Sequence, residues 1–189
     1  RQASIYAGLP ESVECMTINK VCGSGLKSVM LADQAIRCGD ADVIVAGGME
    51  NMSQSPYYLM DARDGMRLGH KKVVDSLIRD GLWDPYGDMH MGNCAEVLAK
   101  EENYSREEQD KFAVESYRRS MEAIENGYFN DEIISISVPQ RKGDPIIVKT
   151  DEEPGRGKPE KMSKLSTAFE KEGTITAANA SSINDGAAA

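Results

Sequence analysis

The stretch NKVCGSGLKSV, residues 19–29, places a cysteine between a predicted strand and a helix that opens on glycines. The preceding CMTIN, residues 15–19, mixes β-branched and polar residues and predicts a short strand. The run LKSVMLADQAIRCG is apolar around most of its circumference, which predicts a largely buried helix ending at Gly39. Residues 43–46, VIVA, then form an unbroken apolar run. Strand, helix and apolar strand in this order are typical of a βαβ unit in a sheet that is covered on both faces.

Cys22 stands where this helix is expected to begin, and two interpretations fit that position. The unpaired N–H groups and the dipole of a helix N-terminus favour the thiolate, which is the reactive form. Gly23 and Gly25 let a substrate approach the backbone, whose spare amides could hold an oxyanion. Alternatively, Cys22 is simply packed, because cysteine is among the residue types most often buried. The local pattern is not a dinucleotide fingerprint, since the third glycine of G-x-G-x-x-G is missing.

The composition excludes several classes of protein. A hydrophobic content of 40% with 28% charged residues fits a globular chain. A net charge of −9 predicts a surface that repels nucleic acid and anionic lipid, so we expect no nucleic-acid partner. No apolar run approaches the roughly 20 residues that cross a bilayer, so we expect no membrane partner either. The four cysteines include no C-x-x-C pair, which argues against zinc and favours free thiols in a reducing compartment.

The composition changes in the middle of the chain, which is rich in glycine, methionine and charged residues from about residue 53. One helix is expected near residues 93–101. A second helix has a well-defined start, because Ser105 and Glu108 have the spacing of a capping box. Asn126 with Gly127 is expected to end it.

Two apolar stretches follow these helices. IISISV and IIVK flank the turn sequence RKGDP and predict a hairpin with a half-exposed first strand. DEEPGRGKPEK predicts a polar connector, and GTITAANASSINDGAAA begins as a strand that returns to a packed core. The predicted organisation is therefore an α/β core in residues 1–52, an inserted mixed α+β region in 53–172 and a returning strand in 173–189.

The motifs in sequence order resemble those of the thiolases. The similar stretches span most of the chain: INKVCGSGLKSV, VAGGMENMS, HMGNCAE, MSKL..AF.KEGT.TAANAS and NDGAAA. The resemblance implies a thiolase-like layered α-β-α-β-α core, of which this chain would hold part of the N-terminal half. Residues 53–172 would then be the loop domain on the coenzyme A side. The resemblance also favours the nucleophile interpretation of Cys22.

The activity that this resemblance implies is that of an acetyl-CoA C-acetyltransferase of the acetoacetyl-CoA type. Cys22 would accept an acetyl group, and a second acetyl-CoA would attack that thioester in a reversible Claisen condensation; the reverse reaction is thiolysis by CoA. Splitting one hard step into two is the use of a covalent intermediate. Two alternatives stay open, a broader 3-ketoacyl-CoA thiolase and a non-catalytic fragment that binds CoA or oligomerises.

The resemblance also assigns pocket residues. His90 and Met91, in DMHMG, match the pair that marks the short-chain type, although a loop histidine that caps the backbone is the alternative for His90. His70 has no such match and is expected to be solvated.

Coenzyme A needs cations for its phosphates and an apolar slot for pantetheine. GRGKPEK supplies Arg156, Lys158 and Lys161, and the resemblance favours Arg156 and Lys161 as contacts of the nucleotide end. A solvated charge run is the alternative. The positions that the resemblance assigns to the rest of the CoA site are Leu82, Tyr86, Phe169 and Ser181.

No tightly bound cofactor is expected, since coenzyme A is a substrate here. The resemblance admits one ion, K+, at Tyr86 and the carbonyls of Ala177, Ala178 and Ala180. A buried aromatic is the alternative for Tyr86. The resemblance further implies a homodimer or homotetramer, cytoplasmic or in the mitochondrial matrix of a eukaryote.

One departure from the family concerns the base. The family's N-E-A-F asparagine, G-H-P histidine and C-x-G cysteine have no counterpart in these 189 residues. Because that histidine activates the nucleophile and that cysteine moves the α-proton, we expect the isolated chain to be inactive. An intact mass near 20.7 kDa would indicate a true fragment, and a mass about twice as large a longer enzyme.

Overall fold

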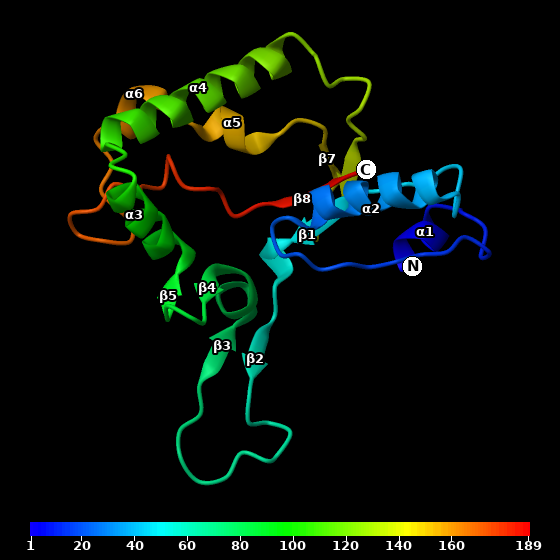
Figure 1. The fold of residues 1–189 in the computed structure, drawn as a ribbon, viewed down its shortest axis with the longest axis horizontal. Helices are drawn as coiled ribbons and strands as arrows, with labels where there is room; N and C mark the ends of the chain where they lie inside the picture. The colour runs from blue at the N-terminus through cyan, green and yellow to red at the C-terminus, as the bar shows by residue number, and fades with distance from the viewer. The chain divides into compact units, whose positions relative to one another are not determined.

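The computed structural model describes residues 1–189 and divides into two compact units (Figure 1). The N-terminal unit comprises Arg1–Gly81 with Ile183–Ala189, and the central unit is Leu82–Ser182. The predicted boundaries at 52/53 and 172/173 do not coincide with this division, and as boundaries of the family's domains they stay a prediction.

The N-terminal unit contains short elements joined by long irregular segments. They are α1 (Gln2–Tyr6), α2 (Ser24–Cys38), β1 (Gly48–Asn51), the 3₁₀-helix η1 (Met52–Gln54), β2 (Tyr57–Leu59), β3 (Val73–Asp75) and β8 (Asp185–Ala188). The π-helix η2 (Leu77–Leu82) begins in this unit and ends at Leu82, the first residue of the central unit. β2 pairs with β3, and β1 pairs with β8, all antiparallel.

The predicted helix after Cys22 is confirmed, with its C-terminus at the expected residue. Gly39 takes the left-handed conformation at φ 79°, and its N–H donates to the carbonyl of Ile36 at 3.1 Å. Glycine adopts that conformation without steric cost, which explains why the helix stops there. The predicted burial is wrong, however, because no residue of α2 is buried and Leu26 is 71% exposed.

The two strands predicted on either side of α2 are also absent. Residues 15–19 and 43–46 belong to no ladder, and Val43 is 85% exposed. A strand needs a partner for its backbone N–H and C=O groups, and the apolar pattern reports side chains rather than partners. The parallel βαβ unit is thus replaced by α2 lying against β1, with the Ser28 hydroxyl donating to the Gly47 carbonyl at 3.1 Å.

The last residues of the chain return to β1. Gly48 lies opposite Ala188 and Asn51 opposite Asp185. The Asp185 carboxylate fixes this register, since it accepts from the Ser53 N–H at 2.9 Å and the Ser53 hydroxyl at 2.6 Å. These bonds from Ser53 hold the pKa of Asp185 below its ordinary value.

The central unit is helical with two small hairpins. Its elements are β4 (Trp83–Asp84), β5 (Met89–His90), α3 (Met91–Glu101), α4 (Arg106–Glu125), β6 (Ile136–Val138), β7 (Ile146–Val148), α5 (Glu152–Arg156) and α6 (Pro159–Met162). The predicted hairpin is confirmed, with β6 and β7 paired antiparallel, although both strands are exposed throughout. The connector predicted at 151–161 instead carries α5 and α6, which pack on α4.

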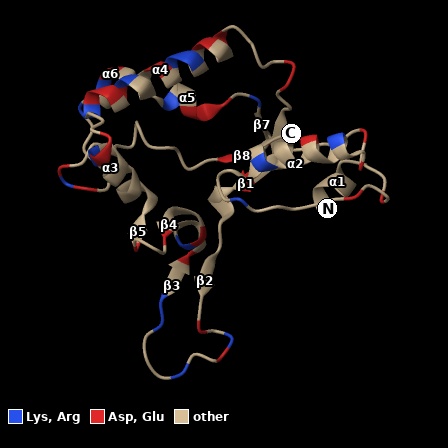
Figure 2. Ribbon diagram, in the orientation of Figure 1, with Lys and Arg blue, Asp and Glu red and all other residues tan.

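The helix α4 begins as its capping box predicts. The Glu108 N–H donates to the Ser105 hydroxyl at 3.2 Å, and the Ser105 N–H donates back to the Glu108 carboxylate at 2.9 Å. Acidic and basic residues are interspersed along its exposed surface (Figure 2), where Arg118 pairs with Glu115 and Glu122. No helix of the chain combines the length and apolar character needed to cross a membrane.

The buried apolar side chains all belong to the central unit. They are Ala99, Ala113, Met162 and Ile175, from α3, α4, α6 and the segment after α6. This small core holds residues 162–181 against α3 and α4, and those residues include many of the predicted site positions.

Candidate functional site

Cys22 is exposed on a tight turn just before α2, whose N-cap is Gly23. The Ser24 side chain ties this turn together: its hydroxyl donates to the Val21 carbonyl at 2.7 Å and accepts from the Lys20 N–H at 2.8 Å. Lys20 and Cys22 also form an isolated parallel bridge. The thiol is therefore presented to solvent by a turn with its own hydrogen bonds.

The residue before the cysteine has a strained backbone. Val21 has φ 49°, in the left-handed region that a β-branched side chain rarely adopts. Its N–H donates to the Asn19 side-chain oxygen at 2.8 Å, which helps to hold this conformation. Strain of this kind persists where the surrounding contacts overdetermine it, and it is concentrated at functional positions.

The first turn of α2 also leaves backbone donors free beside the thiol. Ser24 and Lys27 donate to the carbonyls of Val21 and Gly23, at 3.1 and 2.9 Å. The N–H groups of Gly25 and Leu26 donate to no other group of the chain. A thiol and unpaired N–H groups at one helix start have the chemistry of a nucleophile with an oxyanion site.

His90 caps α3 and stacks on an aromatic ring. Its Nδ1 accepts from the Gly92 N–H at 3.1 Å, so the proton of the neutral ring is on Nε2. The rings of His90 and Phe169 are 5.0 Å apart at 26°. This contact requires glycine at position 92, because a Cβ there would overlap the Phe169 ring. Met91 follows His90 as the first residue of α3 and is 40% exposed.

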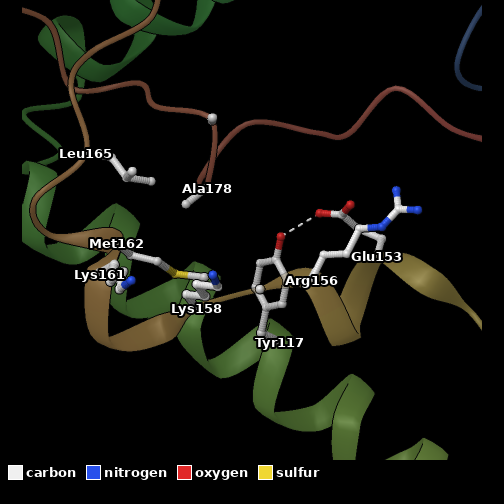
Figure 3. A pocket seen from close by; sticks show the side chains of 10 residues that line it. Tyr117, Glu153, Arg156, Lys158, Lys161, Met162, Leu165 and Ala178 are labelled. Atoms are coloured by element: carbon white, nitrogen blue, oxygen red, sulfur yellow. Dashed lines mark hydrogen bonds between the residues drawn. The ribbon is translucent and has the colours of Figure 1, made fainter.

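A pocket of about 270 Å³ opens beside α4, α5 and α6 (Figure 3). Arg156, Lys158 and Lys161 supply its positive charge. Tyr117 and Glu153 lie at one side, where the tyrosine hydroxyl donates to the carboxylate at 2.6 Å. That bond raises the pKa of Tyr117 and lowers the pKa of Glu153. The rest of the lining is Gly157, Met162, Leu165, Ala177 and Ala178.

A second pocket of about 280 Å³ shares Tyr117, Glu153 and Ala178 with the first. Ser181 and Ala180 contribute to its lining, with Phe112 and Ser116 of α4 and neighbouring residues. Both pockets therefore border the Tyr117–Glu153 contact. The structure brings Arg156 and Lys161 together in the first pocket and places Ser181 in the second.

The other predicted positions lie elsewhere in the central unit. Leu82 is half-buried at the end of η2 and lines neither pocket. Tyr86 is 97% exposed in the turn between β4 and β5 and lines neither pocket. Ala177 and Ala178 line the first pocket and Ala180 the second, and the potassium site at these residues and Tyr86 stays a prediction.

The sequence did not single out Glu96, which is completely buried. Its carboxylate accepts from the N–H groups of Thr174 and Ile175 at 2.9 and 2.8 Å, and from the Thr174 hydroxyl at 3.0 Å. Burial alone would raise its pKa, but these hydrogen bonds outweigh that effect and the pKa is lowered. The available signal was its spacing from Gly92 and Ala99, which share the buried face of α3.

Tyr117 and Glu153 are further residues of both pockets that the motifs did not reveal. Tyr117 is an aromatic residue in the middle of α4, and nothing in its spacing marks it as a pocket residue. Glu153 is one charge among many in an acidic connector. Their roles depend on contacts between segments, which the spacing within one segment does not report.

Comparisons with known proteins identify the fold. The family described as "Thiolase, N-terminal domain" matches residues 1–189. The chain belongs to the thiolase family. It is 60% identical to an acetyl-CoA acetyltransferase of Pseudomonas aeruginosa and 57% identical to one of Cupriavidus necator, covering all of this chain and 48% of each relative. It thus spans about half the length of these curated relatives.

A solved thiolase has the same fold. The crystal structure of the Acat5 thiolase from Ascaris suum in complex with coenzyme A superposes with a TM-score of 0.88 at 44% identity. The match covers 98% of this chain and 47% of that one. The expected α/β thiolase fold is therefore confirmed for this part of the family's architecture.

Proposed function

We propose that this thiolase chain carries the acyl-accepting cysteine of an acetyl-CoA C-acetyltransferase. The observation that supports this most is the turn at Cys22, which combines an exposed thiol, the strained Val21 and free N–H groups at the start of α2. The names of the similar P. aeruginosa and C. necator proteins agree with this activity.

In the proposed reaction the Cys22 thiolate attacks the thioester carbonyl of acetyl-CoA. The C–S bond to CoA breaks, CoA leaves as its thiolate, and acetyl-Cys22 remains. A second acetyl-CoA that has lost an α-proton then attacks this new thioester; acetoacetyl-CoA forms and the Cys22 thiolate is released. The N–H groups of Gly25 and Leu26 are proposed to stabilise the oxyanion of each tetrahedral intermediate. No residue of this chain is assigned as the base.

The first pocket is the proposed site for the nucleotide end of coenzyme A. Three cations line it, and Lys158 and Lys161 are exposed with no carboxylate paired to them, whereas Arg156 pairs with Glu152. Cations positioned in this way bind phosphate oxygens well. Phe169, Ser181 and Leu82 are proposed to lie along the pantetheine arm, with Tyr86 as a further CoA contact.

His90 and Met91 are proposed to give the preference for short acyl groups. The His90 ring is fixed by its bond to the Gly92 N–H and by its stack on Phe169, which leaves the Nε2 proton as the donor available to a substrate. Longer 3-ketoacyl-CoA substrates would then be cleaved more slowly than acetoacetyl-CoA. Equal rates would favour the broader 3-ketoacyl-CoA thiolase.

The oligomeric state and the compartment are proposals too. We propose a homodimer or homotetramer that works in the cytoplasm, or in the mitochondrial matrix of a eukaryote. Light scattering of the purified protein measures the first of these. No step of the proposed reaction is assigned to K+.

Transfer of a radiolabelled acetyl group tests the proposed function directly. The purified intact enzyme is incubated with labelled acetyl-CoA, the reaction is quenched in acid, and the labelled peptides are identified by peptide mapping. We expect the label on the peptide that contains Cys22, and none after Cys22→Ser. Cys38→Ser is the matched control, since Cys38 is an exposed cysteine at the other end of α2. Label that persists in Cys22→Ser would overturn the assignment.

A further inference from the structure

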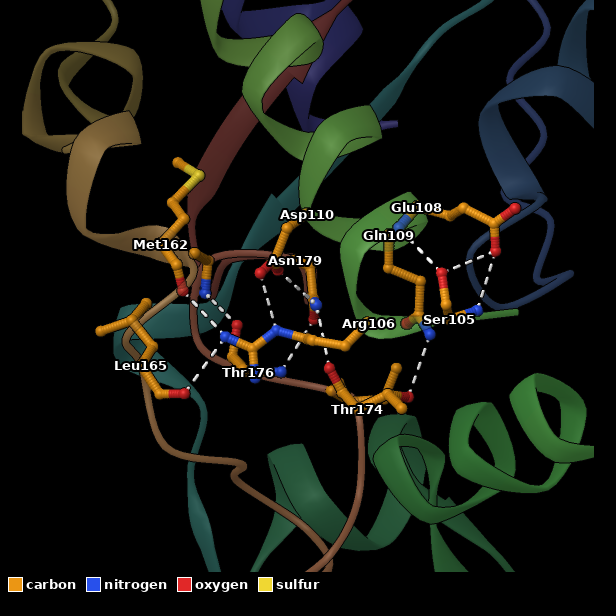
Figure 4. Close-up of polar contacts among 12 residues, drawn as sticks. Ser105, Arg106, Glu108, Gln109, Asp110, Met162, Leu165, Thr174, Thr176 and Asn179 are labelled. Atoms are coloured by element: carbon orange, nitrogen blue, oxygen red, sulfur yellow. Dashed lines mark hydrogen bonds and ion pairs between the residues drawn. The ribbon is translucent and has the colours of Figure 1, made fainter. Parts of the chain in front are cut away.

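Arg106 of α4 bonds to two carbonyls far away in the sequence (Figure 4). Its Nη2 donates to the carbonyl of Met162 at 2.8 Å and to that of Leu165 at 3.1 Å. Its Nε donates to the Asp110 carboxylate at 2.7 Å, one turn along the helix. One planar guanidinium thus joins α4 to the segment that follows α6.

Asp110 continues this connection on its other side. Its second carboxylate oxygen accepts from the Asn179 side-chain amide at 3.0 Å. The same amide group donates to the Thr174 carbonyl at 3.0 Å, and its oxygen accepts from the Thr176 N–H at 2.8 Å. The bridge Arg106–Asp110–Asn179 therefore links residues 162–165 to residues 174–179.

These two segments both line the first pocket. Met162 and Leu165 line it from one segment, and Ala177 and Ala178 from the other. No hydrogen bond joins the two segments of lining residues directly. The nearest direct backbone link lies just beyond Leu165, where the Ala168 N–H donates to the Ile175 carbonyl at 2.9 Å. The side-chain bridge therefore helps to set how the lining residues stand.

The placement of this ion pair is not explained by stability alone. Arg106 is the first residue of α4, where a positive charge opposes the helix dipole. The two side chains are only 21% and 10% exposed, so both charges lose much of their hydration. A largely buried pair of this kind is often no more stabilising than an apolar pair of similar volume. Its specific contribution is geometry, because guanidinium and carboxylate fix several partners at once.

We propose that Arg106 is a positioning residue for acyl-CoA binding, which holds the two sides of the first pocket at their binding separation through Asp110 and Asn179. This inference rests on the proposed function, since it takes acyl-CoA as the ligand of the pocket. Arg106 does not line the pocket and touches no substrate itself.

The test compares Arg106→Lys with Arg118→Lys in the purified intact enzyme, since the isolated chain is expected to be inactive. Lysine keeps the charge but cannot serve both carbonyls and the carboxylate in one plane. We expect Arg106→Lys to raise KM for acetyl-CoA by about tenfold, the effect of losing one to two hydrogen bonds, with kcat changed by less than about twofold. Arg118 is the matched control because it lies on the same helix, pairs with Glu115 and Glu122, and is exposed. Its variant should keep the parent KM.

A second variant cuts the bridge from its other end. Asn179→Ala should raise KM to a similar extent, and the double variant with Arg106→Lys should be no worse than the more affected single variant, since one bridge is broken twice. The proposal would be overturned if the rise in KM of the double variant were the product of the two single rises. A KM unchanged by Arg106→Lys would also overturn it.

Hydrogen exchange separates this proposal from the proposed function. In Arg106→Lys the amides of 162–165 and of 174–179 should both exchange faster, whether or not the protein turns over acetyl-CoA. If the intact parent protein, and not only these 189 residues, shows no turnover but the two segments respond together, the proposed function fails and the bridge stands. If only one segment responds, the bridge is overturned.

Discussion

The two units of this thiolase chain hold their functional residues by different means. The central unit contains every buried apolar side chain and three buried polar ones, Glu96, Asp110 and Thr176. In the N-terminal unit the buried set is Ser76 alone, and apolar residues such as Val43 are exposed. The predicted CoA-binding residues thus belong to the unit that contains the buried core, whereas the turn at Cys22 is held by local hydrogen bonds.

Because of this difference, the turn at Cys22 and the pocket beside α4 should respond differently to substitutions. The turn at Cys22 is held by Asn19 and Ser24, residues within a few positions of it, so it depends on local chemistry. The pocket beside α4 depends on contacts that join distant segments. Substitutions in the central unit should therefore change global stability, while those around Cys22 should change reactivity more than stability.

The largest expected effect in the central unit comes from Glu96. Glu96→Gln turns an amide N–H₂ toward backbone donors that the carboxylate satisfies, so it should lower the free energy of unfolding by about 3 kcal/mol. Urea denaturation measures the change. Glu101→Gln, at the exposed end of the same helix, is the control and should stay within about 0.5 kcal/mol of the parent. Equal losses in the two variants would show that buried polar anchors do not distinguish the central unit.

The same carboxylate predicts a pH dependence. Because folding lowers the pKa of Glu96 below its ordinary value of 4.5, its contribution is complete above that value and is lost as the pH falls through the lowered pKa. Denaturation midpoints of the parent should therefore fall below pH 4.5 more steeply than those of Glu96→Gln. Parallel curves for the two proteins would contradict this.

A smaller effect is expected at the start of α4. Ser105→Ala removes the hydroxyl that accepts from the Glu108 N–H, and loss of such a cap costs about 1 kcal/mol. Thermal unfolding measures this change. Ser116→Ala, an exposed serine in the middle of the same helix, should leave the transition within error. A Ser105→Ala variant as stable as the parent would exclude the capping box as a stabilising feature.

The smallest effect on stability is expected at Val21, with the opposite sign. Val21→Gly removes the steric cost of φ 49° but adds freedom to the unfolded chain, so a net gain of about 0.5 kcal/mol is expected. Acetylation of Cys22 should slow at the same time, because the turn is less rigid. Val29→Gly, in the interior of α2, should instead lose about 1 kcal/mol. If Val21→Gly loses as much as Val29→Gly, the turn is not strained.

The sequence predicted features whose cause is local. Gly39 ends α2 and Ser105 begins α4 because a left-handed glycine and a capping box act within one turn. The strand expected at 43–46 is absent because a ladder requires a partner, which no local pattern reports. Likewise Arg156, Lys158 and Lys161 stand out by their charge, and the resemblance favours Arg156 and Lys161 as CoA contacts. Glu96 and Arg106 could not, since their partners lie 78 and 56 residues away.

Cysteine labelling tests the central claim about Cys22 most directly. Cys15 is the demanding internal comparison, because a hydrogen bond with the Ser4 hydroxyl lowers the pKa of its thiol and it is exposed as well. Iodoacetamide is applied to the purified protein with and without acetyl-CoA, and modification of all four cysteines is followed by peptide mapping. We predict that Cys22 is labelled fastest and that acetyl-CoA protects it alone. Equal labelling of the four cysteines, or protection that does not fall on Cys22, would contradict its role as the acyl acceptor.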